Sequence, residues 1–251
     1  MIELRCHNLN CDSRLQQIDL DFTQANFVHL IGPNGAGKST LLETLAGIIK
    51  PSSGHVILRQ QTLESYNLHQ LAAMRSMLKQ QDSVSFPLTV EELLLFYCNW
   101  QYAIPKQIEL ALEVEQYRHR HLPELSGGEQ QRVQLARVLL QIWSVIEQGE
   151  GLLLLDEPLK GLDLRHQQKL MSLLKSLSKS GNKVVMSLHD LNWCDGYADQ
   201  VVLLKQGRLV ATGTVQQTLI PQQLSSAFDC LISVQTSLEG KKLLQTVENP
   251  S

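Results

Sequence analysis

The 251-residue sequence has no uninterrupted run of about eighteen apolar residues, the length that a helix needs to cross a bilayer. Its first residues, MIELRCHNLNCDSRL, also lack the long apolar core of a signal peptide. We therefore expect neither a membrane span nor a secretory leader.

Cysteine is scarce, and its spacing indicates no disulfide framework. The number of cysteines is odd, and no two of them form a CxxC motif. This pattern favours reduced thiols in a cytoplasmic protein. Cys6, His7 and Cys11 are an alternative set of metal ligands, but no second pair of ligands lies near them in the sequence. The five cysteines are Cys6, Cys11, Cys98, Cys194 and Cys230.

The sequence also lacks an excess of charge of either sign, because its formal net charge is −3 and 43% of its residues are hydrophobic. This composition is typical of a soluble globular protein with one large domain or two modest ones. Without a basic excess, nucleic acid is not expected as a partner.

Four short runs are almost entirely apolar, as strands buried on both faces of a parallel sheet should be. Stretches with helical periodicity separate them, and this alternation predicts an α/β fold with an antiparallel β portion at the N-terminus. Residues 203–213 are predicted to form a hairpin that turns at Gly207. The expected strands are 27–31, 151–155, 183–187 and 200–205, and the expected helices include 38–48, 128–147 and 164–180.

Residues 82–125 interrupt this alternation, because they show no buried-strand pattern and only helical stretches, at 89–100 and 105–117. We predict an inserted α-helical subdomain that divides a discontinuous core, formed by 1–81 and 126–225. The C-terminal tail, 226–251, is predicted to form a small β-hairpin turning near Glu239 and Gly240.

The segment GPNGAGKS, residues 32–39, fits the pattern GxxxxGK[ST] between an expected strand and an expected helix. Glycines in such a loop let backbone N–H groups surround phosphate oxygens, the lysine reaches the terminal phosphates, and the serine hydroxyl is suited to Mg²⁺. A glycine-rich turn with an incidental lysine is the plain alternative. The candidate phosphate-binding residues are Gly32, Pro33, Asn34, Gly35, Ala36, Gly37, Lys38, Ser39 and Thr40.

The stretch LLLLDEP, residues 152–158, places two carboxylates after a buried strand. Asp156 would stand at the edge where parallel sheets bind ligands and is predicted to hold Mg²⁺ through water. Glu157 is predicted to be the general base that polarises the attacking water. An ordinary strand end is the alternative, and the phosphate-binding loop makes it the weaker one.

The stretch LSGGEQ, residues 125–130, predicts a serine-capped helix whose N-terminus is a second anion site, formed by Ser126, Gly127 and Gly128. Here the sequence resembles the ATP-binding-cassette (ABC) family over roughly residues 1–225, since Lys38, Ser126, Asp156 and His189 occur in the family's order. The resemblance implies a P-loop NTPase core, ATP and Mg²⁺ as ligands, and ATP hydrolysis. It also implies a homodimer in which the LSGGEQ of one cassette closes over the ATP of the other.

The resemblance implies further roles. Gln80 matches the glutamine that senses Mg²⁺ and the attacking water, with Gln81 as an alternative by one residue. His189 matches the switch histidine that contacts the γ-phosphate. Asp163 matches the aspartate that communicates across the dimer, although Gly161 stands where the family usually has serine.

The N-terminal stretch around residues 9–14 departs from the family, because it has no aromatic residue to stack on adenine. Our hypothesis is that the planar guanidinium of Arg14 stacks on the base instead. A solvated surface arginine is an equal alternative.

A single cassette without a coiled coil or a second P-loop resembles the separate ATPase subunit of a bacterial importer. Such a subunit works with two integral-membrane permease subunits, indirectly with a periplasmic binding protein, and is peripheral on the cytoplasmic face of the inner membrane. The loop at 29–42, the aromatic-free N-terminal loop and the lengthened stretch before Asp156 most resemble cobalamin (vitamin B12) importers. Haem and iron-siderophore importers are the alternatives, because the ATPase does not touch the cargo.

Overall fold

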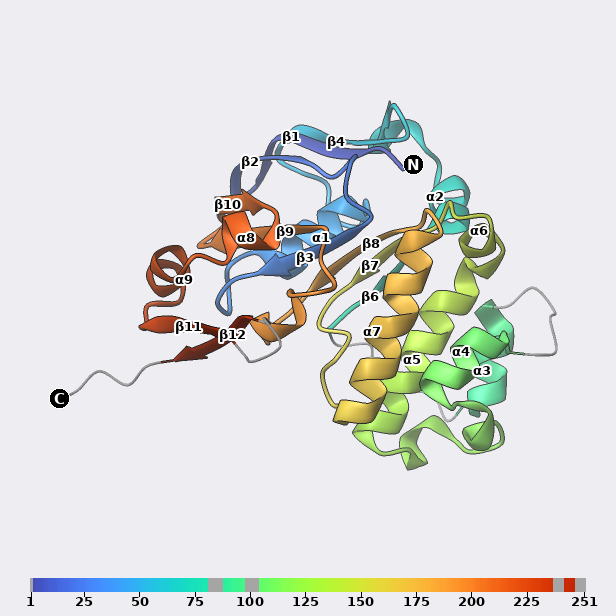
Figure 1. Ribbon diagram of the computed structural model, residues 1–251. Helices are drawn as coiled ribbons and strands as arrows, with labels where there is room; N and C mark the ends of the chain where they lie inside the picture. Colours follow the sequence, from blue (N-terminus) through green and yellow to red (C-terminus); the bar gives the residue numbers. More distant parts are fainter. Residues whose placement is uncertain (1, 81–87, 98–103, 237–241, 247–251) are drawn as a thin grey trace.

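The computed structural model describes residues 2–80, 88–97, 104–236 and 242–246. Its centre is a six-stranded sheet in which only the last hairpin pairs antiparallel (Figure 1). Every residue in three of its strands is buried, which explains their continuous apolar runs. In spatial order the strands are β10 (Arg208–Gly213), β9 (Gln200–Lys205), β3 (Phe27–Ile31), β8 (Lys183–Ser187), β7 (Leu152–Leu155) and β6 (Arg75–Leu78).

A second, antiparallel sheet is formed by the N-terminal part of the chain, as predicted. Its strands, in spatial order, are β2 (Leu15–Asp21), β1 (Leu4–Cys11), β4 (Ser53–Leu58) and β5 (Gln61–Thr62). In β1 the side chains of Cys6 and Cys11 are buried, whereas His7 is exposed. Burial raises the pKa of the Cys6 thiol to about 12. The alternative metal site of Cys6, His7 and Cys11 is therefore wrong, and both cysteines are free thiols.

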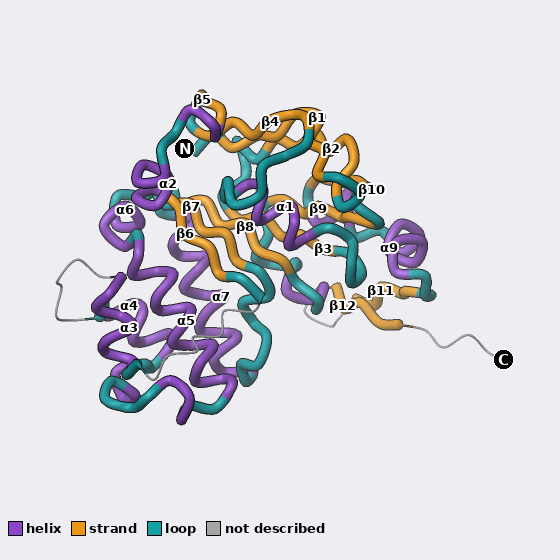
Figure 2. Tube along the Cα trace, turned by 180° about the vertical axis from the view of Figure 1, so that it is seen from behind, coloured by secondary structure: helices purple, strands orange, loops and turns teal. Residues whose placement is uncertain are grey.

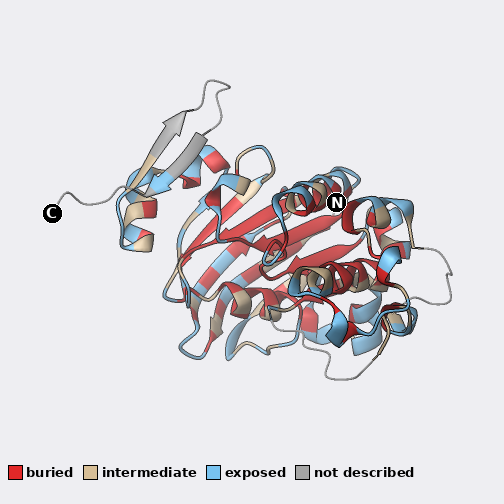
Figure 3. Cartoon of the chain, turned by 90° about the horizontal axis from the view of Figure 1, so that it is seen from below, coloured by how far each residue is buried: buried red, intermediate tan, exposed pale blue. Residues whose placement is uncertain are grey.

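The two sheets enclose helix α1 (Lys38–Leu45), and helices α5 (Gly127–Gln141) and α7 (Leu164–Lys179) cover the opposite face of the larger sheet (Figure 2). Alternate residues of β7 serve the two sides: Leu152 and Leu154 pack in the apolar cluster that contains α1, whereas Leu153 packs with the helices. Buried residues accordingly concentrate in the central strands and on the helix faces turned toward them (Figure 3).

The described part of 82–125 is helical, in agreement with the predicted helical character, and where this subdomain begins and ends remains a prediction. It contains α3 (Val90–Tyr97), α4 (Lys106–Leu112) and the 3₁₀ turns η2 (Glu115–Tyr117) and η3 (Leu122–Glu124). Helix α3 packs against α5, and α4 packs against both α5 and α7.

Shorter elements complete the fold. The C-terminal hairpin of β11 and β12 is confirmed, while its expected turn at Glu239 and Gly240 lies outside the described residues. The shorter elements, the two strands of this hairpin included, are η1 (Leu63–Ser65), α2 (Leu68–Met74), α6 (Trp143–Glu147), η4 (Leu191–Trp193), α8 (Val215–Thr218), α9 (Pro221–Phe228), β11 (Ile232–Thr236) and β12 (Lys242–Thr246).

Most predicted core elements are confirmed within one to three residues at their ends. The long helix expected at 128–147 is instead two helices, because Ile142 leaves the helical conformation at φ −124° and ψ 25°. The edge strand β6 was not predicted. Within the described ranges, no helix has the length and apolar character to cross a membrane.

Candidate active site

The loop between β3 and α1 depends on glycines with unusual backbone angles. Gly32 has φ of 144° and Gly37 has φ of 101°, values that residues with a side chain rarely adopt. A Cβ atom at Gly32 would lie 2.2 Å from the carbonyl oxygen of Leu204, and one at Gly37 would lie 2.9 Å from that of Arg14. A tight glycine loop that ends at a helix N-terminus presents backbone N–H groups to an anion.

The ammonium group of Lys38 is held inside this loop. Its Nζ donates hydrogen bonds to the carbonyl oxygens of Gly32 at 2.7 Å and Pro33 at 3.1 Å. Burial lowers the pKa of Lys38, and the carboxylates of Glu157 and Asp156 oppose that shift. The lysine is therefore fixed inside the loop, and its charge interacts favourably with the two carboxylates.

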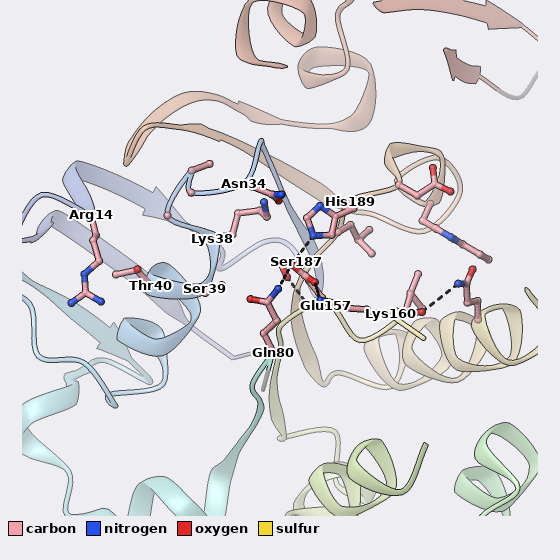
Figure 4. A pocket seen from close by; sticks show the side chains of 18 residues that line it. Arg14, Asn34, Lys38, Ser39, Thr40, Gln80, Glu157, Lys160, Ser187 and His189 are labelled. Atoms are coloured by element: carbon pink, nitrogen blue, oxygen red, sulfur yellow. Dashed lines mark hydrogen bonds and ion pairs between the residues drawn. The ribbon is translucent and has the colours of Figure 1, made fainter. Parts of the chain in front are cut away.

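A cavity of about 690 Å³ adjoins the loop and brings together residues from distant parts of the sequence. In Figure 4, Gln80, Ser187 and His189 gather around Glu157, while Arg14 lies at the other end of the cavity near Thr40. The predicted residues that line it are Asn34, Gly35, Ala36, Gly37, Lys38, Ser39, Thr40, Gln80, Glu157 and His189. Gln81 lies outside the described residues.

Glu157 is the centre of the polar contacts in this cavity. Its Oε1 lies 2.6 Å from Nε2 of His189 and accepts a hydrogen bond from Nε2 of Gln80 at 3.0 Å. Its Oε2 lies 3.5 Å from Nζ of Lys160. Burial raises the pKa of Glu157, but the hydrogen bond and charge of His189, together with Lys160, outweigh it and hold the pKa below its usual range. The carboxylate is therefore ionised near neutral pH, as a general base must be.

Ser187 is a site residue that the sequence reasoning missed. Its hydroxyl accepts a hydrogen bond from the backbone N–H of Glu157 at 2.8 Å and donates one to Oδ1 of Asp156 at 2.6 Å. Glu157 has φ of 50°, a strained value for a residue other than glycine. The hydroxyl thus fixes both acidic residues, from the end of a neighbouring strand. A small hydroxyl two residues before His189 was the available signal.

A smaller cavity of about 230 Å³ brings together Ser39, Gln80 and Asp156, the three residues predicted to bind Mg²⁺. Their hydroxyl, amide and carboxylate oxygens are donors that suit this ion. Among the described residues, no group of three or more His, Cys, Asp or Glu side chains is placed to hold a metal. The donor set therefore fits an ion that takes its other ligands from water and phosphate.

Gly32 and Pro33 do not line the larger cavity but hold Lys38, and Asp156 lines only the smaller one. The other predicted residues that line neither cavity of their own chain are Ser126, Gly127, Gly128 and Asp163. Ser126 caps α5 in a capping box with Glu129, and Asp163 caps α7 by accepting from the backbone N–H of His166 at 2.8 Å. Gly161 has φ of +76°, so the departure from serine suits a left-handed backbone.

Arg14 lines the cavity beside the glycine loop, and its side chain is 54% exposed. Its guanidinium is 3.9 Å from the carboxylate of Asp12, a loose surface ion pair. The planar group is therefore accessible at the cavity, and its stacking on a base stays a prediction. Trp193, which lines the same cavity, was not anticipated.

The comparisons with known proteins identify the family. A family model described as ABC transporter matches residues 15–160. A hemin import ATP-binding protein HmuV from Rhodopseudomonas palustris (strain BisB18) is 42% identical, covering 92% of this chain and 88% of that protein. The chain belongs to the ABC transporter family. A protein of the same name from Bradyrhizobium diazoefficiens is also 42% identical, over 86% of this chain and 82% of its own length.

Solved structures of ABC transporters share the fold. A metal-chelate type ABC transporter in an inward-facing conformation superposes with a TM-score of 0.75 at 25% identity, covering 98% of this chain and 97% of that one. A dimeric ATP-binding cassette in a post-hydrolysis state, bound to ADP and Pi, gives 0.69 at 25% identity, covering 84% and 98%. The predicted ABC ATPase fold is confirmed, and the chain is an ATP-binding ATPase of this family.

Proposed function

We propose that this chain is the ATP-hydrolysing subunit of a bacterial haem importer, working through a separate membrane permease. The observation that carries the proposal is the match to hemin import ATP-binding proteins at 42% identity over 92% of the chain. These relatives favour the haem alternative and do not support the cobalamin prediction.

The nucleotide is held by the glycine loop. Backbone N–H groups of residues 34–40 and the N-terminus of α1 surround the phosphates, and Lys38 turns from the carbonyl oxygens of Gly32 and Pro33 to the terminal phosphates. Arg14, at the far end of the cavity, is placed to cover the base.

Hydrolysis is assigned to the residues around Glu157. The ionised carboxylate accepts a proton from water. His189 and Gln80, which both bond to its Oε1, hold the carboxylate in place. His189 then contacts the γ-phosphate, and Gln80 contacts the attacking water. A Mg²⁺ ion held by Ser39, Gln80 and Asp156 would neutralise charge that develops on the phosphate oxygens.

A second copy of the chain completes each site in this proposal. Ser126, Gly127, Gly128 and Asp163 do not line their own cavity, and a head-to-tail partner would bring them to it. The solved cassette bound to ADP and Pi is itself dimeric. Closure of the pair would move the helical segment and, through it, two permease subunits, so we place the chain peripherally on the cytoplasmic face of the inner membrane. A periplasmic binding protein would deliver the cargo to the permease and would therefore be only an indirect partner of this chain.

Uptake of labelled haem, cobalamin and ferric siderophore tests this assignment. Cells that lack the chain are complemented with the wild type, with Glu157→Gln, or with Glu147→Gln, a surface control at the end of α6. We expect haem uptake to return with the wild type and the control only.

The other outcomes are equally informative. Cobalamin uptake that depends on the wild-type chain would restore the cobalamin prediction made from the sequence. Siderophore uptake that depends on it would support the siderophore alternative. If no cargo depended on the chain, the importer role would be wrong although the ATPase activity would stand.

A further inference from the structure

A buried polar cluster lies outside the active-site cavity, between α5, α7 and the end of α4. Its centre is His166 in the first turn of α7 and Arg132 in α5, which are 8% and 7% exposed. Tyr117 of η2 is also buried and lies beneath the guanidinium, 5.1 Å from ring centroid to Cζ of Arg132. Buried polar groups of this kind require partners, and each of them has some.

His166 uses both of its ring nitrogens. Nδ1 lies 2.9 Å from the carboxylate oxygens of Asp163, and Nε2 lies 3.0 Å from Nη1 of Arg132. Because an arginine N–H can only donate, Nε2 of His166 must be the acceptor in that contact. We assign the proton to Nδ1, which then donates to Asp163, because the contact between Nε2 and Oε2 of Glu113 is longer, at 3.4 Å. The ring therefore connects α5 to the loop before α7 through two hydrogen bonds, one at each nitrogen.

Arg132 is fixed independently of this bond. Nη1 also donates to the carbonyl oxygen of Leu112 at 3.0 Å, and Nη2 donates to the hydroxyl of Tyr117. Glu113, at the end of α4, accepts from Arg165 of α7 at 2.8 Å and lies 3.4 Å from Nε2 of His166. The anchor for His166 thus includes three helices.

The loop that carries Asp163 also touches the start of α5, through Gly161. A Cβ atom on Gly128 would lie 2.7 Å from the carbonyl oxygen of Gly161, so the loop before α7 packs directly on the first turn of α5. The hydrogen bonds from the backbone N–H and ring of His166 also hold the pKa of Asp163 below its usual range. The carboxylate is therefore ionised and oriented in the free chain.

We propose that His166 is a positioning residue for ATP hydrolysis, which locks Asp163 to α5 through Arg132. The two elements that meet the partner's ATP, the start of α5 and Asp163, then move as one unit. This inference rests on the head-to-tail dimer of the proposed function. It assigns His166 a role although the residue lines neither cavity of the site.

Two variants separate the two hydrogen bonds. An asparagine amide reaches about as far as Nδ1 of histidine, and a glutamine amide about as far as Nε2. His166→Asn therefore keeps the side-chain hydrogen bond to Asp163 and loses the one from Arg132. His166→Gln keeps the hydrogen bond from Arg132 and loses the side-chain hydrogen bond to Asp163. His69→Gln, at an exposed histidine in α2, is the control.

The full chain is assayed for kcat and KM of ATP hydrolysis and for ATP affinity by equilibrium titration. We expect kcat to fall on the order of tenfold in both His166 variants, with KM and ATP affinity within about twofold of the wild type. A residue that only supported the fold would lower the amount of active protein and leave kcat per folded molecule unchanged, so each variant's folded fraction is measured by its thermal unfolding.

Additivity gives the decisive result. If His166 acts through Asp163, the double variant Asp163→Asn with His166→Gln loses no more activity than Asp163→Asn alone. Unchanged kcat in both His166 variants, or losses that multiply in the double variant, would overturn the proposal. Should His166→Gln fail to fold, Asp163→Asn removes the charge at the other end of the bond, and normal kcat there would also overturn it. A wild-type chain without ATP hydrolysis would instead refute the proposed function itself.

Discussion

Nε2 of His189 lies 2.6 Å from Oε1 of Glu157, so the end of β8 is joined by a hydrogen bond to the loop that follows β7. The same oxygen accepts from Gln80, which follows β6. The two strands that flank β7, β6 and β8, therefore each contribute one side chain to a single carboxylate oxygen of Glu157. Because the carboxyl ends of parallel strands lie at one edge of a sheet, a catalytic carboxylate there is fixed from both sides.

The first prediction concerns Glu157 as the base. Glu157→Gln keeps the shape of the side chain but replaces one acceptor oxygen with an NH2 donor, and it cannot take a proton from water. We expect hydrolysis to fall by about 100-fold or more, with ATP still bound. Single-turnover hydrolysis and equilibrium ATP binding are measured beside Glu147→Gln. Equal turnover in both variants would remove Glu157 from this role.

The second prediction concerns Ser187, whose hydroxyl joins Asp156 to the backbone of Glu157. Ser187→Ala leaves a buried N–H group and a buried carboxylate oxygen each short of a partner, which costs about 1–3 kcal/mol of unfolding free energy. We expect kcat to fall on the order of tenfold with KM little changed, since the reacting groups lose their orientation.

Ser76→Ala is a matched control for this change. Ser76 is fully buried in the same sheet, and its hydroxyl has no hydrogen-bond partner among the residues that the structure describes. Its removal should leave both stability and kcat nearly unchanged. If Ser76→Ala were as harmful as Ser187→Ala, loss of packing rather than loss of the hydrogen bonds would explain the effect.

The parts of the fold that the sequence predicted are those with a strong local pattern. β3, β8 and β9 are nearly continuous apolar runs, and their bounds agree with the prediction. The glycine loop at residues 32–39 could also be predicted, because its GxxxxGK[ST] spacing is typical of a phosphate-binding turn followed by a helix.

The parts that were missed depend on contacts distant in sequence. β6 has only four residues, and it pairs with β7, whose strand begins 77 positions later. Ser187 was missed because its position two residues before His189 is only a weak signal until the sheet brings it to Asp156. The attachment of Asp163 to His166 and Arg132 was missed for the same reason, since it needs α5 and α7 to pack.

The third prediction concerns Arg14 as the adenine-stacking group. A planar guanidinium on an exposed ring contributes about 0.5–1 kcal/mol, so Arg14→Ala should weaken ATP binding about two- to fivefold. Arg14→Lys keeps the charge but loses the plane, and should weaken ATP binding similarly. Inorganic triphosphate, which has no base, should bind both variants as it binds the wild type.

Equilibrium titration of the three proteins with ATP and triphosphate separates stacking from charge. Full ATP affinity in Arg14→Lys would show that the charge alone matters. Unchanged ATP affinity in Arg14→Ala would return Arg14 to the class of solvated surface arginines.

The last prediction concerns His29, a histidine in the middle of β3 that is fully buried. Its ring packs edge-on against Phe27 at 4.8 Å between centroids, and neither ring nitrogen has a hydrogen-bond partner in the described chain. Burial lowers the pKa of His29 to about 3; the charge of Lys175 adds to this shift and that of Asp199 opposes it. His29 is therefore neutral in the folded protein throughout the usual pH range.

The sign of the pH dependence follows from the different protonation of His29 in the folded and the unfolded chain. Between pH 6.5, the ordinary pKa of histidine, and about 3, the unfolded chain binds a proton at His29 and the folded chain does not. Stability therefore falls as the pH falls through this window, by about 2 kcal/mol from pH 7 to pH 5 for this residue.

Replacing His29 by leucine removes this contribution. We expect His29→Leu to lose about 2 kcal/mol less stability than the wild type between pH 7 and pH 5. It should also be at least as stable at pH 7, because two buried nitrogens without partners are removed. Urea unfolding at the two pH values measures both effects, with His69→Gln as the exposed control. Equal losses of stability between pH 7 and pH 5 in the wild type and His29→Leu would mean that His29 gains its proton in the folded state as readily as in the unfolded one. The interpretation of His29 as a buried neutral histidine would then be wrong.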